Sequence, residues 1–402
     1  MKYTDVAIIG GGLAGSTAAA MLGRASIATV LIDPHPTYPF DFRVEKLSGA
    51  EQIARFRKTG LAEAILAKAS RDGENWIARF GVLLDKVPSQ QFGILYDALI
   101  NAIRCEIPGG VGQIFAKAVS VSTSKDRQEV VLSNDEEISA RLVVLANGLN
   151  VGLRQMLGIE REIVSRAHSI SVGFDIAPVG RTAFDFPAMT YFSERPSDRI
   201  PYITLFPVGE RMRANLFTYR EPGDPWLREI RLATVKTLHA SLPRLKEITG
   251  EFSVTGDVRV RPADLYVNSG YRRPGIVLIG DAFAGTCPVT GTGTDKVFTD
   301  VAQLCSVHIP AWLASEGMGE DKIAAFYDDP VKQACDTRAM EKAYSFRSVS
   351  IDEGLYWRLQ RWARFATWFS RGLLRRAGLR LETLLGAHSS SSSSSSSISS
   401  SA

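Results

Sequence analysis

The stretch that decides the fold is Asp5-Val6-Ala7-Ile8-Ile9-Gly10-Gly11-Gly12-Leu13-Ala14-Gly15. Its first five residues are mostly apolar and rich in β-branched side chains, which predicts a buried strand. The glycines that follow permit a tight turn, and the alanine-rich residues 16–22 predict a helix. Residues 28–33 predict a second strand that ends in an acid, Asp33. This order of elements predicts a βαβ unit of the dinucleotide-binding kind.

The chemistry of this unit follows from the pattern Gly10-x-Gly12-x-x-Gly15, in which Ala14 lies inside the turn. Backbone without side chains can approach a pyrophosphate, and the helix N-terminus presents free N–H groups and the positive end of its dipole. Asp33 follows Gly15 by 18 residues and is placed to accept hydrogen bonds from a ribose. A glycine turn without a ligand is the alternative, and the agreement of all the parts disfavours it.

A second glycine-rich segment, residues 280–295, follows a predicted buried strand at 275–279. It therefore lies at the carboxyl edge of the sheet, where such folds bind ligands. Asp281 is placed to hold hydroxyls of an extended sugar chain. The turn Gly291-Thr292-Gly293 opens a helix predicted over about 294–315, and aims backbone N–H groups at an anion. The alternative is an active-site loop for a different phosphate ligand.

The two motifs together resemble the group A flavoprotein monooxygenase family, which has the para-hydroxybenzoate hydroxylase fold. That family writes its second motif as GDAxHxxxPxxGxGxNxxxxD. The residues of this chain that match it are Gly280, Asp281, Ala282, Pro288, Gly291, Gly293 and Asp300. Ala284 and Asp295 replace the usual histidine and asparagine.

Two further positions carry the resemblance. A middle motif, near ADGxxSxVR in the family, corresponds to residues 146–154, with Asn147 in place of the aspartate and no serine. Arg43 falls where the family often has an arginine that contacts the flavin. The alternative for Arg43 is a surface ion pair with Glu45 or another acid.

The resemblance implies an FAD cofactor, with NAD(P)H as a transient reductant. The cofactor-binding residues that it implies, together with the motif readings above, are Gly10, Gly12, Ala14, Gly15, Asp33, Arg43, Gly280, Asp281, Pro288, Gly291, Thr292 and Gly293. Pro288, Gly291 and Gly293 would shape the surroundings of flavin C4a and N1. No side chain is assigned as a catalytic acid or base, because the cofactor carries the chemistry.

The implied activity is hydroxylation or epoxidation of a small organic molecule, aromatic or prenyl-like for example, through a flavin C4a-hydroperoxide. Relatives with the same fold leave alternatives open. These are an FAD-dependent reductase or dehydrogenase of the geranylgeranyl-reductase type, a flavin-dependent halogenase, and a flavin-binding partner protein without activity. The halogenase signature WxWxIP is absent, since the tryptophan nearest a proline is Trp226 in Pro225-Trp226-Leu227.

The expected fold class is α/β, with a Rossmann-like FAD-binding domain, an inserted β-sheet substrate domain and C-terminal helices. Residues 44–105 are expected to be mainly helical, with Leu95, Leu99 and Ile103 on one helix face. Residues 129–132 and 142–145 predict strands, and 225–243 a helix. The expected division is 1–75, 92–165 and 271–330 for the FAD-binding domain, 76–91 and 166–270 for the substrate domain, 331–386 for a helical segment, and 387–402 for a disordered serine-rich tail.

The segment 355–386 contains seven arginines and one acid, Glu382. One helix face repeats Leu355, Leu359, Trp362, Ala366, Phe369 and Leu373. The arginines roughly opposite this face are Arg361, Arg364, Arg371 and Arg375. We expect the helix to dock on the body with its arginines in water. An alternative is peripheral contact with an anionic membrane surface.

Composition excludes several other classes of protein. The chain has 402 residues, 45% of them hydrophobic, and a net charge of +4 that is concentrated in the C-terminal segment. A basic surface for nucleic acid is therefore not expected. The four cysteines form no CxxC pair, and the five histidines are far apart, so no metal site is expected. No signal peptide and no apolar run long enough to span a membrane are visible. We expect a cytoplasmic protein with a small-molecule substrate.

Overall fold

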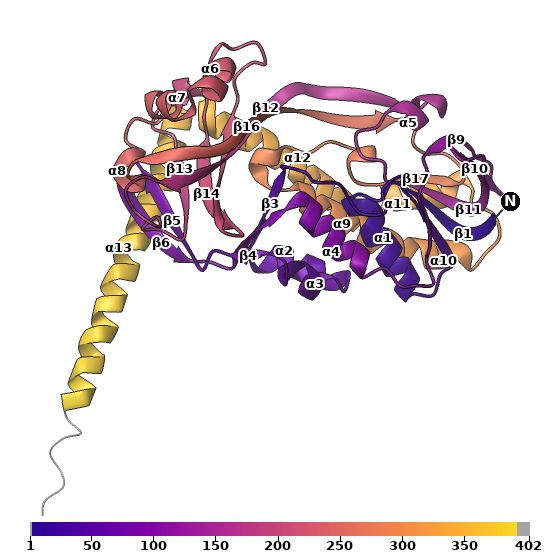
Figure 1. Cartoon of the computed structure of the whole chain (residues 1–402), viewed down its shortest axis with the longest axis horizontal. Helices are drawn as coiled ribbons and strands as arrows, with labels where there is room; N and C mark the ends of the chain where they lie inside the picture. Colours follow the sequence, from indigo (N-terminus) through magenta and orange to yellow (C-terminus); the bar gives the residue numbers. More distant parts are fainter. Residues whose placement is uncertain (1, 392–402) are drawn as a thin grey trace, which may run out of the picture.

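The computed structural model describes residues 2–391, and the side chains of all of these except 48 and 379–391. Figure 1 shows two bodies joined by the long strands β12 (Glu160–Pro178) and β16 (Phe252–Ser269), with a C-terminal helix that leaves one end of the molecule. The expected α/β class is confirmed, because one body is built on a largely parallel sheet with helices packed against it.

The first sheet has seven strands in the order β8-β2-β1-β11-β10-β9, with β17 also paired to β11. Their bounds are β1 (Lys2–Ile9), β2 (Thr29–Ile32), β8 (Gly112–Ile114), β9 (Ala118–Ser122), β10 (Gln128–Leu132), β11 (Glu137–Leu145) and β17 (Ile276–Leu278). Strands β8, β2, β1, β11 and β17 pair in parallel. Val6, Ala7 and Ile8 of the opening stretch are fully buried between covered faces, as the run of apolar residues predicts.

The second sheet also has seven strands, in the order β16-β12-β15-β14-β13-β5-β6. Its other strands are β5 (Glu74–Arg79), β6 (Val82–Pro88), β13 (Ala188–Phe192), β14 (Tyr202–Val208) and β15 (Arg211–Thr218). All neighbours are antiparallel except β5 and β13. A small third sheet has the order β3-β7-β4, with β3 (Val44–Ser48), β4 (Ser70–Arg71) and β7 (Gln91–Leu95).

The expectation that residues 44–105 are mainly helical is wrong. Three helices are present there, α2 (Gly49–Lys58), α3 (Ala62–Leu66) and α4 (Tyr96–Cys105), and strands β3 to β7 occupy much of the remainder. Only α4 has the expected face, with Leu99 and Ile103 fully buried. The strands form because β5 pairs with β13, more than a hundred residues later in the chain. A local pattern does not reveal such a distant partner.

The remaining helices fall within segments that the sequence predicts to be helical, except the short helices at 152–156 and 246–249, which were not predicted. They are α1 (Leu13–Arg24), α5 (Gly152–Met156), α6 (Trp226–Leu232), α7 (Thr234–Ser241), α8 (Lys246–Thr249), α9 (Gly293–Gln303), α10 (Ile309–Leu313), α11 (Glu320–Tyr327), α12 (Pro330–Ile351) and α13 (Leu355–Ser391). Shorter turns are η1 (Pro196–Asp198), η2 (Gly280–Ala282), η3 (Pro288–Thr290) and η4 (Leu304–His308). The helix predicted over 294–315 corresponds to α9, η4 and α10, and that over 225–243 to α6 and α7.

The division into domains stays a prediction. Strands β5 and β6 belong to the second sheet although their neighbours in sequence do not. The expected boundary at 165/166 lies inside β12, and this strand pairs with β16 from Glu160 to Pro178. The two bodies therefore share continuous strands.

Helix α13 docks on the edge of the second sheet, but not with the face that the sequence suggested. Phe365 is buried against the sheet, and a Cβ at Gly372 would lie 2.1 Å from the Leu84 carbonyl oxygen. Arg375 forms an ion pair with the buried carboxylate of Asp85 at 3.0 Å. Arginines thus face the protein, and the expectation that they lie in water is wrong for Arg361, Arg364 and Arg375, which are partly buried. Asp85 on β6 supplies a partner that helix periodicity could not show.

The expected apolar face of α13 is exposed instead. The exposed fractions are 69% for Leu355, 60% for Leu359, 56% for Trp362, 43% for Phe369 and 49% for Leu373. The helix continues to Ser391, so residues 387–391, which we expected to be disordered, are helical. The rest of the serine-rich tail, 392–402, lies outside the described residues. Within residues 2–391, no helix is both long enough and apolar enough to cross a membrane.

Candidate active site

The three glycines of the first motif have different structural roles. Gly10 has a φ of +105°, and a Cβ there would lie 2.6 Å from the carbonyl oxygen of Ala146. A Cβ at Gly15 would lie 1.8 Å from the carbonyl oxygen of Gly10, so this glycine permits α1 to pack on the turn. A Cβ at Gly12, in contrast, would meet nothing within 4 Å. The backbone at Gly12 therefore borders open space at the N-terminus of α1.

Asp33 lies beside this turn, as the sequence predicts. Its carboxylate accepts hydrogen bonds from the backbone N–H of Gly11 at 2.7 Å and from that of His35 at 2.9 Å. Arg104 of α4 lies 3.1 Å from the same carboxylate and also donates to the carbonyl oxygen of Gly11. Arg104 thus connects the Asp33 carboxylate to the backbone of the glycine turn. Sequence reasoning missed it, because its partners are separated from it by some 70 to 90 residues of chain.

The second motif meets the first directly. A Cβ at Gly280 would lie 3.3 Å from the Cβ of Ala14, although the two residues are far apart in the sequence. The carbonyl oxygen of Asp281 accepts a hydrogen bond from the Tyr266 hydroxyl at 2.7 Å. Burial raises the pKa of Asp281, and the positive charges of Arg43 and Arg261 oppose the shift. The Asp281 carboxyl group is therefore within electrostatic reach of Arg43.

The turn that leads into α9 is ordered by its own side chains. Pro288 begins η3, Gly291 has a φ of +64°, and Thr292 is the N-cap position of α9. The hydroxyls of Thr290 and Thr292 lie 3.0 Å apart. Because α9 starts at Gly293, the positive end of its dipole lies at this turn. The arrangement can stabilise an anion placed there.

The replacement of the family's asparagine by Asp295 is accompanied by a cation. Arg55 of α2 lies 2.9 Å from the Asp295 carboxylate. Gln52, also of α2, donates a hydrogen bond to the same carboxylate at 3.1 Å. The extra negative charge at the N-terminus of α9 is therefore paired. Arg55 and Gln52 are two further residues that sequence reasoning missed, because α2 is distant in the chain.

Arg43 forms an ion pair with an acid, which was the alternative interpretation, but its partner is Asp41 and not Glu45. Its Nε donates to the Asp41 carboxylate at 2.7 Å, and its guanidinium lies 3.8 Å from the centre of the Tyr96 ring. Burial raises the pKa of the neighbouring Glu45 to about 7, although Arg43 opposes the shift. Glu45 is therefore an acid of this site that changes its charge close to neutral pH.

Asn147 of the middle motif provides a further indication of a ligand. Both polar atoms of its side-chain amide are buried, and no described residue is their partner. Asn147 adjoins the turn, since a Cβ at Gly10 would lie 2.9 Å from its Cα. Buried polar groups are normally hydrogen-bonded. The orphaned amide, the open space at Gly12 and the carboxyl groups of Asp33 and Asp281 together fit a dinucleotide cofactor.

The comparison with known families decides the identity of this fold. A family model described as "FAD binding domain" matches residues 3–313, which is most of the chain. The chain belongs to this family, that of the group A flavoprotein monooxygenases. The expected resemblance is therefore confirmed, and so is FAD as the cofactor.

Two curated proteins that are similar to this flavoprotein are hydroxylating enzymes. The chain is 27% identical over 338 residues to 3-demethoxyubiquinol 3-hydroxylase of Escherichia coli (strain K12), covering 77% of this chain and 80% of that protein. It is 25% identical over 358 residues to 6-hydroxynicotinate 3-monooxygenase of Bordetella bronchiseptica, covering 81% and 86% respectively. Two of the similar solved structures follow.

The fold is similar to that of p-nitrophenol 4-monooxygenase PnpA from Pseudomonas putida DLL-E4, with a TM-score of 0.71 and 16% identity over 96% of this chain and 99% of that one. It is also similar to aklavinone-11 hydroxylase in complex with FAD and aklavinone, with a TM-score of 0.67 and 19% identity over 86% and 69%. This flavoprotein is thus an FAD-dependent monooxygenase of small molecules, and NAD(P)H is the reductant typical of its family. A halogenase is among the similar solved structures, with a TM-score of 0.65 and 14% identity, which shows a shared fold.

An Arg104→Met variant tests whether the contacts of Arg104 with Asp33 and with the glycine turn support FAD binding. Methionine keeps an apolar stem but removes the donors to Gly11 and Asp33. We expect FAD to bind about tenfold more weakly, because a lost hydrogen bond to a charged group costs roughly 1.5–3 kcal/mol. The dissociation constant can be measured by quenching of flavin fluorescence on titration of the apoprotein. Arg24→Met is the matched control, since Arg24 of α1 pairs with Glu106 away from the turn. Equal FAD affinity in both variants would contradict the assignment.

Proposed function

We propose that the flavoprotein holds FAD with the residues of both motifs. The diphosphate would lie against Gly12 at the N-terminus of α1, and the adenosine ribose against Asp33. Asp281 would bind the ribityl chain, and the turn from Pro288 to Gly293 would lie beside the isoalloxazine ring. The open space at Gly12 is the observation that carries this assignment, because a Cβ placed there meets no protein atom within 4 Å.

The residues around η3 would form the wall between flavin and substrate. The Tyr202 hydroxyl donates a hydrogen bond to the carbonyl oxygen of Val289, and so fixes the turn. Phe217, Tyr219 and Cys287 pack in the same buried cluster. Burial raises the pKa of the Cys287 thiol, which therefore stays neutral. A wall of this kind excludes water and suits an apolar ring.

The substrate that we propose is a small aromatic molecule that already carries a hydroxyl group. Bound FAD supplies oxygen activation, and an electron-rich ring accepts the oxygen atom. The names of the relatives support the class, since a quinol, a hydroxypyridine and a nitrophenol occur among them. The chain itself would orient the ring against Pro288. The positive end of the α9 dipole would stabilise negative charge that develops on the flavin beside Gly291 to Gly293.

The experiment that tests the proposal follows the flavin spectrum without oxygen. We expect purified protein to be yellow and NADH or NADPH to bleach it, faster when a hydroxylated aromatic compound is present. With ¹⁸O₂, labelled oxygen should appear in the product. Turnover without incorporation of the label would instead support a reductase or dehydrogenase of the geranylgeranyl-reductase type. Bound FAD that neither nicotinamide reduces, with or without an aromatic compound, would contradict the proposal.

We further propose that α13 brings the enzyme to an anionic lipid surface. Its exposed face carries the apolar side chains of Leu355, Leu359, Trp362, Phe369 and Leu373. Residues 355–378 contain no acid, and three of their arginines, Arg358, Arg371 and Arg376, are exposed, so the helix is complementary in charge to anionic headgroups. Figure 1 shows that the C-terminal part of α13 extends beyond the second sheet.

A double variant, Leu359→Glu with Leu373→Glu, tests the lipid contact. We expect co-sedimentation with phosphatidylglycerol vesicles to fall by at least about tenfold, since each buried leucine contributes roughly 1.5–3 kcal/mol. Leu232→Glu is the control, because Leu232 of α6 is 75% exposed and lies on another part of the surface. The lipid proposal fails if the parent protein does not co-sediment with vesicles but forms dimers that the double variant cannot form. In that case the apolar face binds a second copy of the chain.

A further inference from the structure

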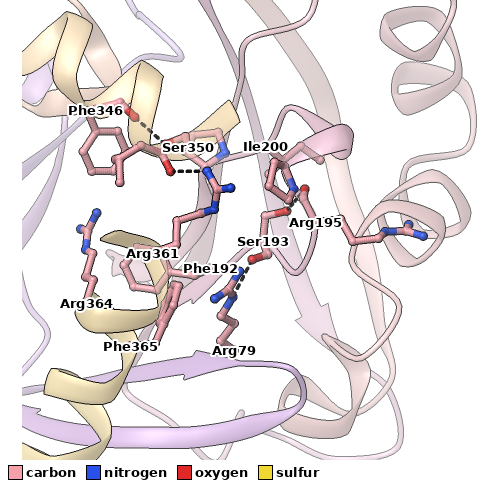
Figure 2. Close-up of a pocket in the computed structure, with 13 residues that line it drawn as sticks. Arg79, Phe192, Ser193, Arg195, Ile200, Phe346, Ser350, Arg361, Arg364 and Phe365 are labelled. Atoms are coloured by element: carbon pink, nitrogen blue, oxygen red, sulfur yellow. Dashed lines mark hydrogen bonds between the residues drawn. The ribbon is translucent and has the colours of Figure 1, made fainter. Parts of the chain in front are cut away.

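A pocket lies between the second sheet and the two C-terminal helices, apart from the residues that we assign to FAD. Its lining includes Arg79, Phe192, Arg195, Phe346, Arg361 and Arg364. A water-sized sphere can move within only about 30 Å³ of it, which is room for a small polar group and not for a whole organic ligand. We call it the arginine pocket. Figure 2 shows Arg79, Arg361 and Arg364 around it, and Arg195 directed away from it.

The lining of this pocket holds arginines and, among the described residues, no aspartate or glutamate. Arg195 has its own partner, Asp198, at 3.1 Å. Among the described side chains, no carboxylate lies within ion-pair distance of Arg79, Arg361 or Arg364. Glu194 acts on Arg79, and Asp352 and Glu353 act on Arg361, only from a greater distance.

The contacts of the three arginines leave many donors unused. Arg79 donates from Nε to the carbonyl oxygen of Ser193 at 2.9 Å, and Arg361 donates to that of Asp352 at 2.8 Å. Arg364 lies 5.1 Å from the ring centres of Phe192 and Phe346, and no described residue accepts a hydrogen bond from it. A guanidinium has five N–H donors in a planar fork that matches oxyanions.

Burial makes the imbalance costly. Arg79 is only 6% exposed, and burial together with the charge of Arg361 lowers its pKa to about 10. Burial also lowers the pKa of Arg364. The like charges of Arg79 and Arg361 repel one another in this partly desolvated pocket, and the repulsion is relieved when an anion enters.

We propose that the arginine pocket binds a small oxyanion, the carboxylate or phosphate group of a low-molecular-weight ligand. Arg364 and Arg361 would hold the anion from α13, and Arg79 from β5. Arg361 and Arg364 lie beyond residues 3–313, which the family model matches, and Arg79 lies within them.

The pocket is also close to the proposed reaction site. The Tyr202 ring packs against both Phe192 and Phe346 of the pocket, with ring centres 6.0 and 5.7 Å apart. The hydroxyl of the same tyrosine bonds the carbonyl oxygen of Val289 in η3. A single aromatic layer thus separates the anion from the turn. The anion can be part of an organic ligand that reaches past Tyr202, or a free ion that fixes this layer and α13.

The test is isothermal titration calorimetry on the full chain saturated with FAD, at low ionic strength. The probes are inorganic phosphate, benzoate and the neutral benzamide. We expect phosphate or benzoate to bind one per chain and benzamide not to bind. In Arg364→Met, anion affinity should fall by at least about tenfold, since charge-assisted bonds are lost. Arg371→Met is the matched control, because Arg371 is exposed on the same helix.

The outcomes separate the two sources of the anion. Binding of benzoate alone supports the carboxylate of an organic ligand, and comparable binding of phosphate supports a free oxyanion. Absence of saturable anion binding, or parental affinity in Arg364→Met, overturns the proposal. If Arg364→Met does not fold, Arg364→Lys takes its place. It keeps the charge but loses the planar fork, so we expect binding several-fold weaker than in the parent. Calorimetry does not require turnover, so this result is independent of the oxygenation reaction.

Discussion

We expect a Gly12→Thr variant to fold as the parent does but to be purified without FAD. The backbone at Gly12 is extended, with φ −77° and ψ −164°, which threonine readily adopts. Threonine also serves about as well as glycine at the N-cap of a helix. Its side chain would enter the open space where a Cβ meets no protein atom within 4 Å. It would therefore exclude the diphosphate without disturbing the protein.

The expected loss is about 2 kcal/mol or more of binding free energy, which is at least ~30-fold in the dissociation constant for FAD. Far-UV circular dichroism and the thermal midpoint of the apoprotein should match those of the parent. Gly15→Ala is the contrasting variant, since its Cβ would lie 1.8 Å from the carbonyl oxygen of Gly10. It should lower the stability of the apoprotein itself. A Gly12→Thr protein that keeps its yellow colour would contradict our placement of the diphosphate.

The largest loss of stability is expected from Asp300→Asn. Asp300 is fully buried on α9, and its carboxylate lies 3.2 Å from the ammonium of Lys296 and 3.1 Å from that of Lys332. Asp336, the other acid of the cluster, is partly exposed. Removing the Asp300 charge leaves two buried lysines with too little compensation. The cost should be about 3–5 kcal/mol of unfolding free energy.

The pH dependence follows from the same cluster. Burial alone would raise the pKa of Asp300, but the positive charges of Lys296 and Lys332 hold this pKa below its ordinary value. A lowered pKa stabilises the folded state above the unfolded-state value of about 4, and this stabilisation is lost as the pH falls through the folded-state pKa. Urea unfolding of the FAD-loaded parent should show this loss in acid, and Asp300→Asn should show less of it.

The control for this prediction is Asp328→Asn, which breaks the exposed pair between Asp328 and Arg272. Exposed pairs contribute little because water and salt screen them, so this variant should unfold at nearly the parental urea concentration. Asp300 also belongs to the family motif, and its burial on α9 between the two lysines gives that position a structural role. If Asp300→Asn unfolds at the same urea concentration as Asp328→Asn, the cluster does not stabilise the fold.

The sequence by itself determined the parts of the protein that local chemistry specifies. The strand, turn and helix around Gly10 to Gly15 follow from steric freedom and hydrophobic pattern, and the acid at the end of β2 follows from its position. The second motif predicted a turn followed by a helix for the same reasons. From these motifs came the family, the cofactor and the expectation of a monooxygenase. The roles of the individual FAD-binding residues stay predictions.

Only the tertiary structure decided what depends on distant partners. Residues 74–88 are strands because β5 pairs with β13, whereas local pattern suggested helices. Arg104, Arg55 and Asn147 enter the site through contacts that no spacing in the sequence reveals. Arg361, Arg364 and Arg375 of α13 face the protein because they contact Asp85 or the aromatic rings beside the helix. The leucines on the other side of the helix face outward. Periodicity shows that a helix has two faces, but which face is buried depends on the charge and shape of the surface that it meets.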